Sequence, residues 1–193
     1  MLTRRRCLAA VTAVAIGEAA AADTDDTAAL RRFLESTIAQ SDSFPDRFAA
    51  EVWLVDMSTR LSPFIPSPAQ RLQLLNLIHR AALRSNLPPE LVLAVIEVES
   101  AFNRFAVSRA GAQGLMQVMP FWRREIGRPD DNLTDNPTNL EYGCRILQFY
   151  IDREAGDLHR ALAAYNGSSG SRRYSNKVQQ AWQARWRTAP LSW

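Results

Sequence analysis

The chain has 193 residues, of which 47% are hydrophobic and 22% are charged, and its formal net charge is +3. With 8 Gly and 10 Pro, this composition excludes a collagen-like or largely disordered chain. A mean hydropathy of -0.22 also excludes a polytopic membrane protein, and the length favours one soluble globular domain.

Residues 1–22 have the organisation of an export signal. Arg4–Arg6 form a basic start, residues 7–17 form an apolar stretch, and Ala20–Ala22 supply small residues for cleavage. A stretch this short does not span a bilayer as a helix, so we expect an exported, periplasmic protein without a stable membrane anchor. The arginines fit both the twin-arginine and the general secretory route. An ordinary amphipathic first helix is the alternative to a signal.

Cleavage would remove Arg4–Arg6 and Glu18, so 20 basic and 19 acidic residues would remain, a net charge of +1. This near balance leaves no argument for a nucleic-acid partner. Cys144 would be the remaining cysteine, which excludes an internal disulfide and favours a buried thiol. With two histidines and no local cluster of cysteines and carboxylates, the sequence predicts no metal site. We expect no other cofactor, and we expect the protein to be a monomer.

Apolar residues recur at helical spacing along nearly all of the mature chain, and no segment shows a sustained alternation of period two. An all-α fold is therefore predicted, with the Pro-rich stretch near residue 66 as the best internal boundary. This boundary divides a helical extension at 23–66 from a main domain at 67–193. Helices are predicted over residues 27–40, 45–60, 68–85, 90–101, 112–119, 121–126, 136–154, 157–165 and 174–186.

The helix predicted over 90–101 carries a carboxylate on an apolar face. Its positions 92, 95, 96 and 99 share one face, on which Glu99 follows two valines and an isoleucine. Loss of water there would raise the pKa of Glu99, which suits a general acid at neutral pH. A structural Glu paired with an arginine is the alternative from this position alone. Glu97 lies about 200° around the helix and is expected at the surface or in a local ion pair.

Two further segments place polar side chains beside glycine. Residues 110–117 contain two glycines and end at Gln117, whose amide could bind a sugar amide or hydroxyl. Another predicted helix ends at Tyr165, which could bind a carboxylate through its hydroxyl, and Asn166 could present its amide into a cleft. A simple helix C-cap at Gly167 is the alternative explanation of this second segment.

In their order and spacing, these motifs resemble those of the lytic transglycosylase SLT domain, a lysozyme-like fold that cleaves peptidoglycan. The likeness extends over about residues 72–186. It implies an all-α, lysozyme-like SLT domain at 67–193 behind the helical extension. One departure is Phe121-Trp122, where the family often has a smaller residue at the cleft edge. The matching stretches are Glu99-Ser100 and residues 108–120, 135–143 and 164–167.

The resemblance implies that Glu99 is a single general acid/base. It would protonate the glycosidic oxygen between N-acetylmuramic acid and N-acetylglucosamine. It would then assist the muramyl 6-hydroxyl in attacking its own anomeric carbon, which gives a 1,6-anhydro product. Peptidoglycan glycan strands are thus the implied partner, and Tyr165 is the residue implied to hold the glutamate. The implied substrate-site residues are Ser108, Gln117, Met119, Tyr165 and Asn166.

Three other functions are compatible with the sequence. The nearest is a lysozyme-type hydrolase on the same scaffold, with water as the acceptor. A second is a non-catalytic glycan-binding protein that has kept the fold. A third is a helical periplasmic adaptor whose match to the motifs is accidental, which four motifs in the family's order disfavour.

Overall fold

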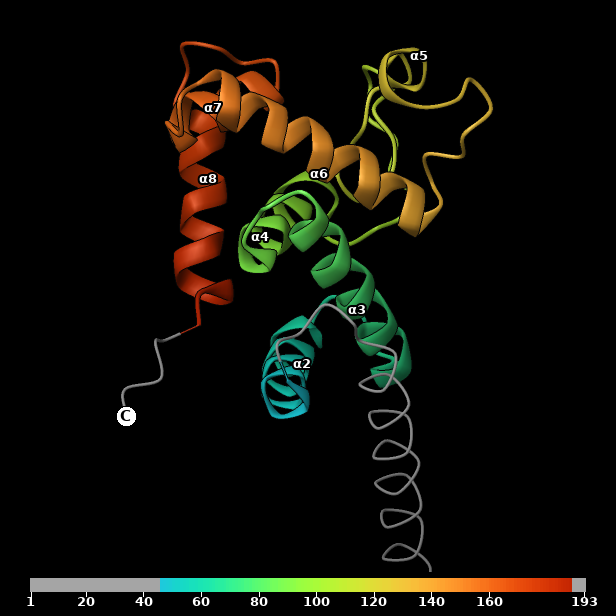
Figure 1. Ribbon diagram of the computed structural model, residues 1–193, viewed down its shortest axis with the longest axis vertical. Coiled ribbons are helices and arrows are strands. Elements are labelled where there is room, and N and C mark those ends of the chain that lie inside the picture. The colour runs from blue at the N-terminus through green and yellow to red at the C-terminus, as the bar shows by residue number, and fades with distance from the viewer. Residues whose placement is uncertain (1–45, 189–193) are drawn as a thin grey trace, which may run out of the picture.

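The structure, a computed structural model, describes residues 46–188, which form seven α-helices and one π-helical turn (Figure 1). The all-α prediction is confirmed for this part of the chain. The export signal and the helix predicted over 27–40 lie outside the described residues. The elements are α2 (Arg47–Leu61), α3 (Pro68–Arg84), α4 (Pro89–Ser100), α5 (Trp122–Ile126), α6 (Asn136–Arg153), α7 (Leu158–Tyr165), α8 (Arg173–Ala181) and the π-helical turn η1 (Trp182–Trp186).

Short polar side chains begin four of the helices. Asp46, Ser67, Asp135 and Asp157 each accept a hydrogen bond from the backbone N–H three residues ahead. Each bond satisfies one of the N–H groups that the first turn of a helix leaves without an intrahelical partner. Proline in the first turn of α3, α4 and α6 fits the same geometry, since its missing N–H is not needed there.

Helix α4 forms the centre of the hydrophobic core. Every residue from Leu91 to Ile96 is at most 2% exposed. The helix packs against α3 on one side and against α8 and η1 on another, while α6 packs on α3 and α7 (Figure 1). A helix that is apolar all round is stable only when neighbours enclose it. Any charged residue near its end therefore lies at the boundary of the core.

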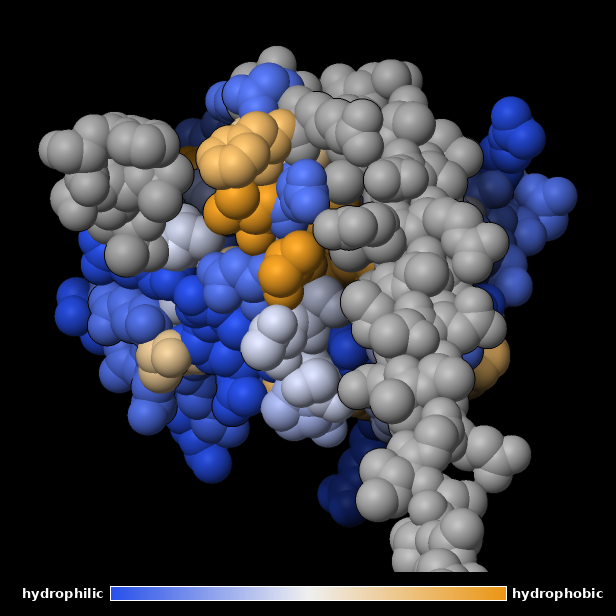
Figure 2. Space-filling view, turned by 90° about the horizontal axis from the view of Figure 1, so that it is seen from below, coloured by the Kyte–Doolittle hydropathy of each residue, from blue (hydrophilic) through white to orange (hydrophobic). Residues whose placement is uncertain are grey.

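Helix α2 is part of this core and also carries an exposed apolar stripe. Ala50, Leu54, Met57 and Leu61 are buried, and α2 packs on α3 and η1. Phe48, Val52 and Val55 are exposed on another face of the helix. Figure 2, which views the molecule from the α2 end, shows hydrophobic side chains gathered at the surface beside hydrophilic ones. The described part of the extension is thus packed directly on the main domain.

The helix predicted over 112–119 is wrong. This segment is a compact loop with two isolated antiparallel bridges, which join Gln113 to Val107 and to Val118. Gly114 and Gln117 have positive φ angles of 78° and 49°, a backbone conformation that a right-handed helix excludes. A side chain at Gly114 would also overlap Asn139 and the Leu133 carbonyl. The apolar spacing here reflects a buried loop.

The side chain of Asn139 on α6 holds this loop in place by hydrogen bonds to backbone groups. Its side chain is 1% exposed. Its Oδ1 accepts from Met116 N at 2.8 Å, and its Nδ2 donates to Gln113 O at 2.8 Å and to Leu133 O at 2.7 Å. A buried amide that satisfies three backbone groups fixes the loop against α6.

Glu97 and Cys144 have structural roles. Glu97 accepts a hydrogen bond from Trp186 Nε1 at 2.7 Å and lies 3.3 Å from Arg185 Nε, so it forms an ion pair, but with a residue far along the chain and not locally. Cys144 is fully buried, and burial raises the pKa of its thiol to about 12. A thiol with so high a pKa is an unreactive part of the core.

The described part of the chain has neither a membrane-spanning helix nor a cluster of metal-binding side chains. Between residues 46 and 188, no helix is both long and apolar enough to cross a lipid bilayer. Within this range, no three His, Cys, Asp or Glu side chains come together in a group that could hold a metal ion.

Candidate active site

Glu99 lies in the last turn of α4, where the chain leaves the core sharply. Ala101 and Phe102, which follow the helix, have positive φ angles of 47° and 64°. The hydroxyl of Ser100 donates to Leu115 O at 2.8 Å and so joins the end of α4 to the loop that Asn139 holds. The backbone on both sides of Glu99 is thereby fixed.

Burial and two hydrogen bonds determine the protonation of Glu99. The hydroxyl of Tyr174 donates to Glu99 Oε1 at 2.7 Å. Burial raises the pKa of Glu99 above its ordinary value, while hydrogen bonds from Tyr174 and Asn166 lower this pKa to a smaller extent. Because burial dominates, the carboxyl keeps its proton to a higher pH than an exposed glutamate does. This is the property that a general acid near neutral pH requires.

The tyrosine that holds Glu99 is Tyr174, and the contact implied for Tyr165 is wrong. The Tyr165 hydroxyl donates to Met116 O at 2.7 Å, and its single proton is used there. The carbonyl of Met116 is open to this bond because its segment is a loop and not a helix. Tyr174 lies in the first turn of α8, and burial beside Glu99 raises its pKa well above 10, so it remains a donor. The position of Tyr174 in the sequence did not distinguish it from an ordinary core tyrosine.

A cavity of about 320 Å³ opens beside Glu99. Of the residues predicted for the site, Glu99 and Asn166 line it. It contains one carboxylate, two cationic side chains and several neutral hydrogen-bonding groups, so it can accommodate a polar ligand next to a protonated acid. Its lining residues are Val98, Glu99, Asn166, Ser168, Ser171, Arg173, Tyr174 and Lys177.

Three other predicted residues belong to the loop that follows α4 and do not line this cavity, and Tyr165 at the end of α7 does not line it either. Gln117 Nε2 donates to the carbonyls of Ala106 and Gly114, so its amide nitrogen shapes the loop. The hydroxyl oxygen of Ser108 accepts from the N–H of Ala112 at 3.0 Å. Met119 is half-buried two residues beyond Gln117. The side chains of Gln117 and Ser108 thus organise the loop, and the contact of all three residues with a substrate stays a prediction.

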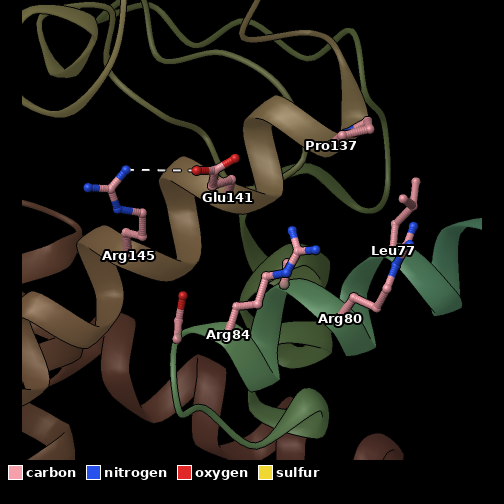
Figure 3. A pocket seen from close by; sticks show the side chains of 8 residues that line it. Leu77, Arg80, Arg84, Pro137, Glu141 and Arg145 are labelled. Atoms are coloured by element: carbon pink, nitrogen blue, oxygen red, sulfur yellow. Dashed lines mark ion pairs between the residues drawn. The ribbon is translucent and has the colours of Figure 1, made fainter. Parts of the chain in front are cut away.

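A second cavity, of about 390 Å³, lies between α3 and α6 (Figure 3). Arginines 80, 84 and 145 surround it together with Glu141, which is 3.8 Å from the Arg145 guanidinium. Glu141 is exposed, and Figure 3 shows it directed toward Arg145. Both cavities contain cations, but the carboxylate of this one is solvated, whereas the cavity beside Glu99 contains an acid whose pKa burial raises. The candidate active site is therefore the cavity beside Glu99.

The sequence of this chain matches the transglycosylase SLT domain over residues 76–186. The chain belongs to the transglycosylase SLT domain family. The match includes Glu99, the loop that follows it and both tyrosines of the site. The SLT domain implied by the sequence motifs is thereby confirmed.

Three curated relatives have names that describe transglycosylases. A transglycosylase of Enterobacteria phage PRD1 is 35% identical over 102 residues, which are 53% of this chain and 37% of that protein. Membrane-bound lytic murein transglycosylase C of Actinobacillus pleuropneumoniae is 36% identical over 51% of this chain and 32% of its own length. The protein of the same name from Photorhabdus laumondii is 31% identical over 60% of this chain and 38% of its own length. The chain thus spans roughly a third of the length of these relatives.

Two solved structures are also similar to this chain. One is an inactive mutant of the lytic transglycosylase Slt from Pseudomonas aeruginosa, with a TM-score of 0.46 and 22% identity over 75% of this chain and 31% of that one. The other is the 70 kDa soluble lytic transglycosylase of Escherichia coli, with the same TM-score and identity over 79% of this chain and 24% of that one. At this similarity neither structure adds evidence on activity.

Proposed function

We propose that this protein is a peptidoglycan lytic transglycosylase that cleaves the β-1,4 bond between N-acetylmuramic acid and N-acetylglucosamine. Its membership of the SLT domain family supports this function. The observation that carries the proposal is Glu99, a carboxyl whose pKa burial raises and which borders an open cavity. Glu99 is also the single carboxylate among the residues that line this cavity.

In the proposed mechanism, protonated Glu99 gives its proton to the glycosidic oxygen as the bond to the muramyl anomeric carbon breaks. The muramyl 6-hydroxyl then attacks that carbon and returns its proton to the Glu99 carboxylate. No water is consumed, and the product carries a 1,6-anhydro ring. One carboxyl serves both steps, whereas most glycosidases need a second one for a nucleophile or a base. Tyr174 and Asn166 orient the Glu99 carboxylate and stabilise it after the first step.

The proposed location of the enzyme is the cell envelope. Two relatives are named as membrane-bound lytic murein transglycosylases, and the first 22 residues of this chain have the organisation of an export signal. In this proposal, residues 23–66 form a helical extension in front of the catalytic domain. Its described part packs on α3 and η1, so it supports the domain and is not a separate unit.

The masses of the products test the proposed chemistry. We expect the full chain to release muropeptides from purified sacculi that are lighter by one water than the same fragments with a reducing end. The reason is that an intramolecular hydroxyl, and not water, attacks the anomeric carbon. Mass spectrometry of the digest reads this difference directly. Products with an ordinary reducing end would contradict the proposed chemistry and would indicate a lysozyme-type hydrolase.

Replacing Tyr174 with Phe should change both the rate and its pH dependence. The general acid works only while protonated, so activity falls as the pH rises through the pKa of Glu99. The Tyr174 hydrogen bond lowers that pKa, so its removal raises the pKa further and moves the loss of activity to a higher pH. With Glu99 less well oriented, we expect kcat to fall about tenfold. The measurement is kcat/KM against pH on solubilised glycan strands.

Tyr165→Phe is the matched control for this change. It removes the same hydroxyl group from a nearby tyrosine whose bond goes to a backbone carbonyl and not to Glu99. We therefore expect Tyr165→Phe to lower stability without moving the alkaline limb of the pH profile. An equal displacement of this limb in both variants, or in neither, would contradict the role of Tyr174.

A further inference from the structure

One edge of the Glu99 cavity carries positive charge that no described residue neutralises. Arg173 and Lys177 line this cavity together with Glu99 and Tyr174. Both cationic side chains are exposed. Within residues 46–188, neither forms an ion pair or a side-chain hydrogen bond. The remainder of the cavity, apart from Glu99 itself, is polar and uncharged or apolar.

The geometry of α8 places these two cations together. Residues four apart on a helix are neighbours on its surface, so Arg173 and Lys177 lie side by side. Tyr174 follows Arg173 directly and is three residues before Lys177, and its side chain reaches Glu99. The two cations therefore form one basic edge beside the tyrosine that holds the catalytic carboxyl.

This arrangement is unfavourable for the helix itself. Like charges four residues apart repel each other, and a cation in the first turn, here Arg173, opposes the helix dipole. The first turn of α8 contains no acidic residue that would compensate. A local arrangement that lowers helix stability beside a cavity is typical of a functional surface. An anionic ligand at this edge would remove both penalties.

We infer that Arg173 and Lys177 bind carboxylates of the peptide stem on the muramyl residue, so that the protein prefers peptide-bearing glycan strands. This inference rests on the proposed function for its substrate class. The amino sugars of the strand offer hydroxyl and acetamido groups, which suit the serines and Asn166 of the cavity. The stem peptide adds free carboxylates, the groups that guanidinium and ammonium ions bind by charge-assisted hydrogen bonds.

The test measures binding without turnover, with the Glu99→Gln variant of the full chain. Its ligands are solubilised glycan strands in three forms. One form is intact, the second has its carboxyl groups converted to amides, and the third has lost its peptides and keeps the lactyl carboxylate. We expect intact strands to bind about five- to tenfold more tightly than either other form, since two exposed charge contacts contribute modestly. This preference should weaken as salt is added.

Adding Arg173→Ala and Lys177→Ala to this variant should remove the preference while leaving the affinity for amidated strands unchanged. Both side chains are exposed, and their loss relieves a repulsion, so the melting temperature should not fall. Arg172→Ala is the matched control, since this exposed neighbour lines a different cavity, beside Glu154 and His159. It should keep the full preference.

Three results would overturn the inference. They are equal binding of intact and amidated strands, a preference that survives the double substitution, and equally tight binding of peptide-free strands. The last result would identify the lactyl carboxylate as the ligand. The product masses test the type of reaction, and the binding measurement needs no turnover. The inference can therefore be tested even if the proposed reaction is wrong.

Discussion

Replacing Glu99 with Gln is expected to lower the release of muropeptides from sacculi by about a thousandfold, within the range that loss of a general acid–base group produces. The amide has nearly the same shape and can still accept the hydrogen bond from Tyr174. It has no acidic proton to give to the glycosidic oxygen, however, and it cannot accept one from the muramyl 6-hydroxyl. The measurement is the initial rate of release at matched enzyme concentration, with circular dichroism as the check on folding.

The same variant should be more stable than the parent chain at neutral pH. Burial raises the pKa of Glu99 in the folded state, so ionisation of this group favours unfolding. The stability of the parent should therefore fall as the pH rises through the interval between the ordinary and the raised pKa. Glu99→Gln has no proton to lose, so its unfolding free energy should not show this decline. Loss of activity without loss of stability separates a catalytic role from a structural one.

Glu97→Gln supplies the matched control for this experiment. The residue lies two positions away on α4, but it pairs with Arg185 and Trp186 on another side of the helix. The same chemical change there should lower stability and leave the rate per folded molecule close to that of the parent. Muropeptide release that continues unchanged in Glu99→Gln would remove Glu99 from its proposed role, whereas a parent chain that releases no muropeptides would favour a non-catalytic glycan-binding protein.

Replacing Asn139 with Ala is expected to lower the free energy of unfolding by about 3–5 kcal/mol, because each buried backbone group left without a partner costs about 1–3 kcal/mol. Three such groups lose their partner, namely Met116 N, Gln113 O and Leu133 O. A loss of this size is a large part of the roughly 5–15 kcal/mol that stabilises a typical domain. Urea unfolding of the two proteins measures the difference.

Activity should fall with stability in this variant, even at temperatures where it remains folded. The loop that Asn139 holds also receives the hydroxyl of Ser100 at Leu115 O and that of Tyr165 at Met116 O. Loosening the loop therefore frees the end of α4 next to Glu99. Asn132→Ala removes an exposed amide that bonds only within its own turn, and it should cost less than about 1 kcal/mol. Similar losses in both variants would contradict the argument from burial.

Local signals were sufficient to predict most of the helices. The end of α3 and the beginning of α4 follow from the two prolines at 88 and 89, and α6 and α7 begin behind Asp135 and Asp157. These signals act within one turn of helix, so neighbouring residues contain the information. The segment at 112–119 was predicted wrongly, because apolar spacing does not distinguish a short buried helix from a buried loop.

Within the site, the residue on which the chemistry is proposed to depend could be identified from local sequence. Glu99 follows a run of apolar residues, so its burial and the upward shift of its pKa could be predicted from the helical period alone. Its family could be inferred as well, because four short motifs stand in the required order. Both results depend on residues close to each other along the chain.

The groups that surround Glu99 follow from the packing of helices that are far apart in the sequence. Tyr174 lies 75 residues away and reaches the carboxylate because α8 packs against α4, whereas Tyr165, which the motif favoured, bonds to Met116. Asn139 and the basic edge of Arg173 and Lys177 likewise acquire their importance from contact or proximity to segments far along the chain. A hydroxyl donates one hydrogen bond, and packing decides which acceptor lies within reach of it. The spacing of residues along the chain does not contain this information.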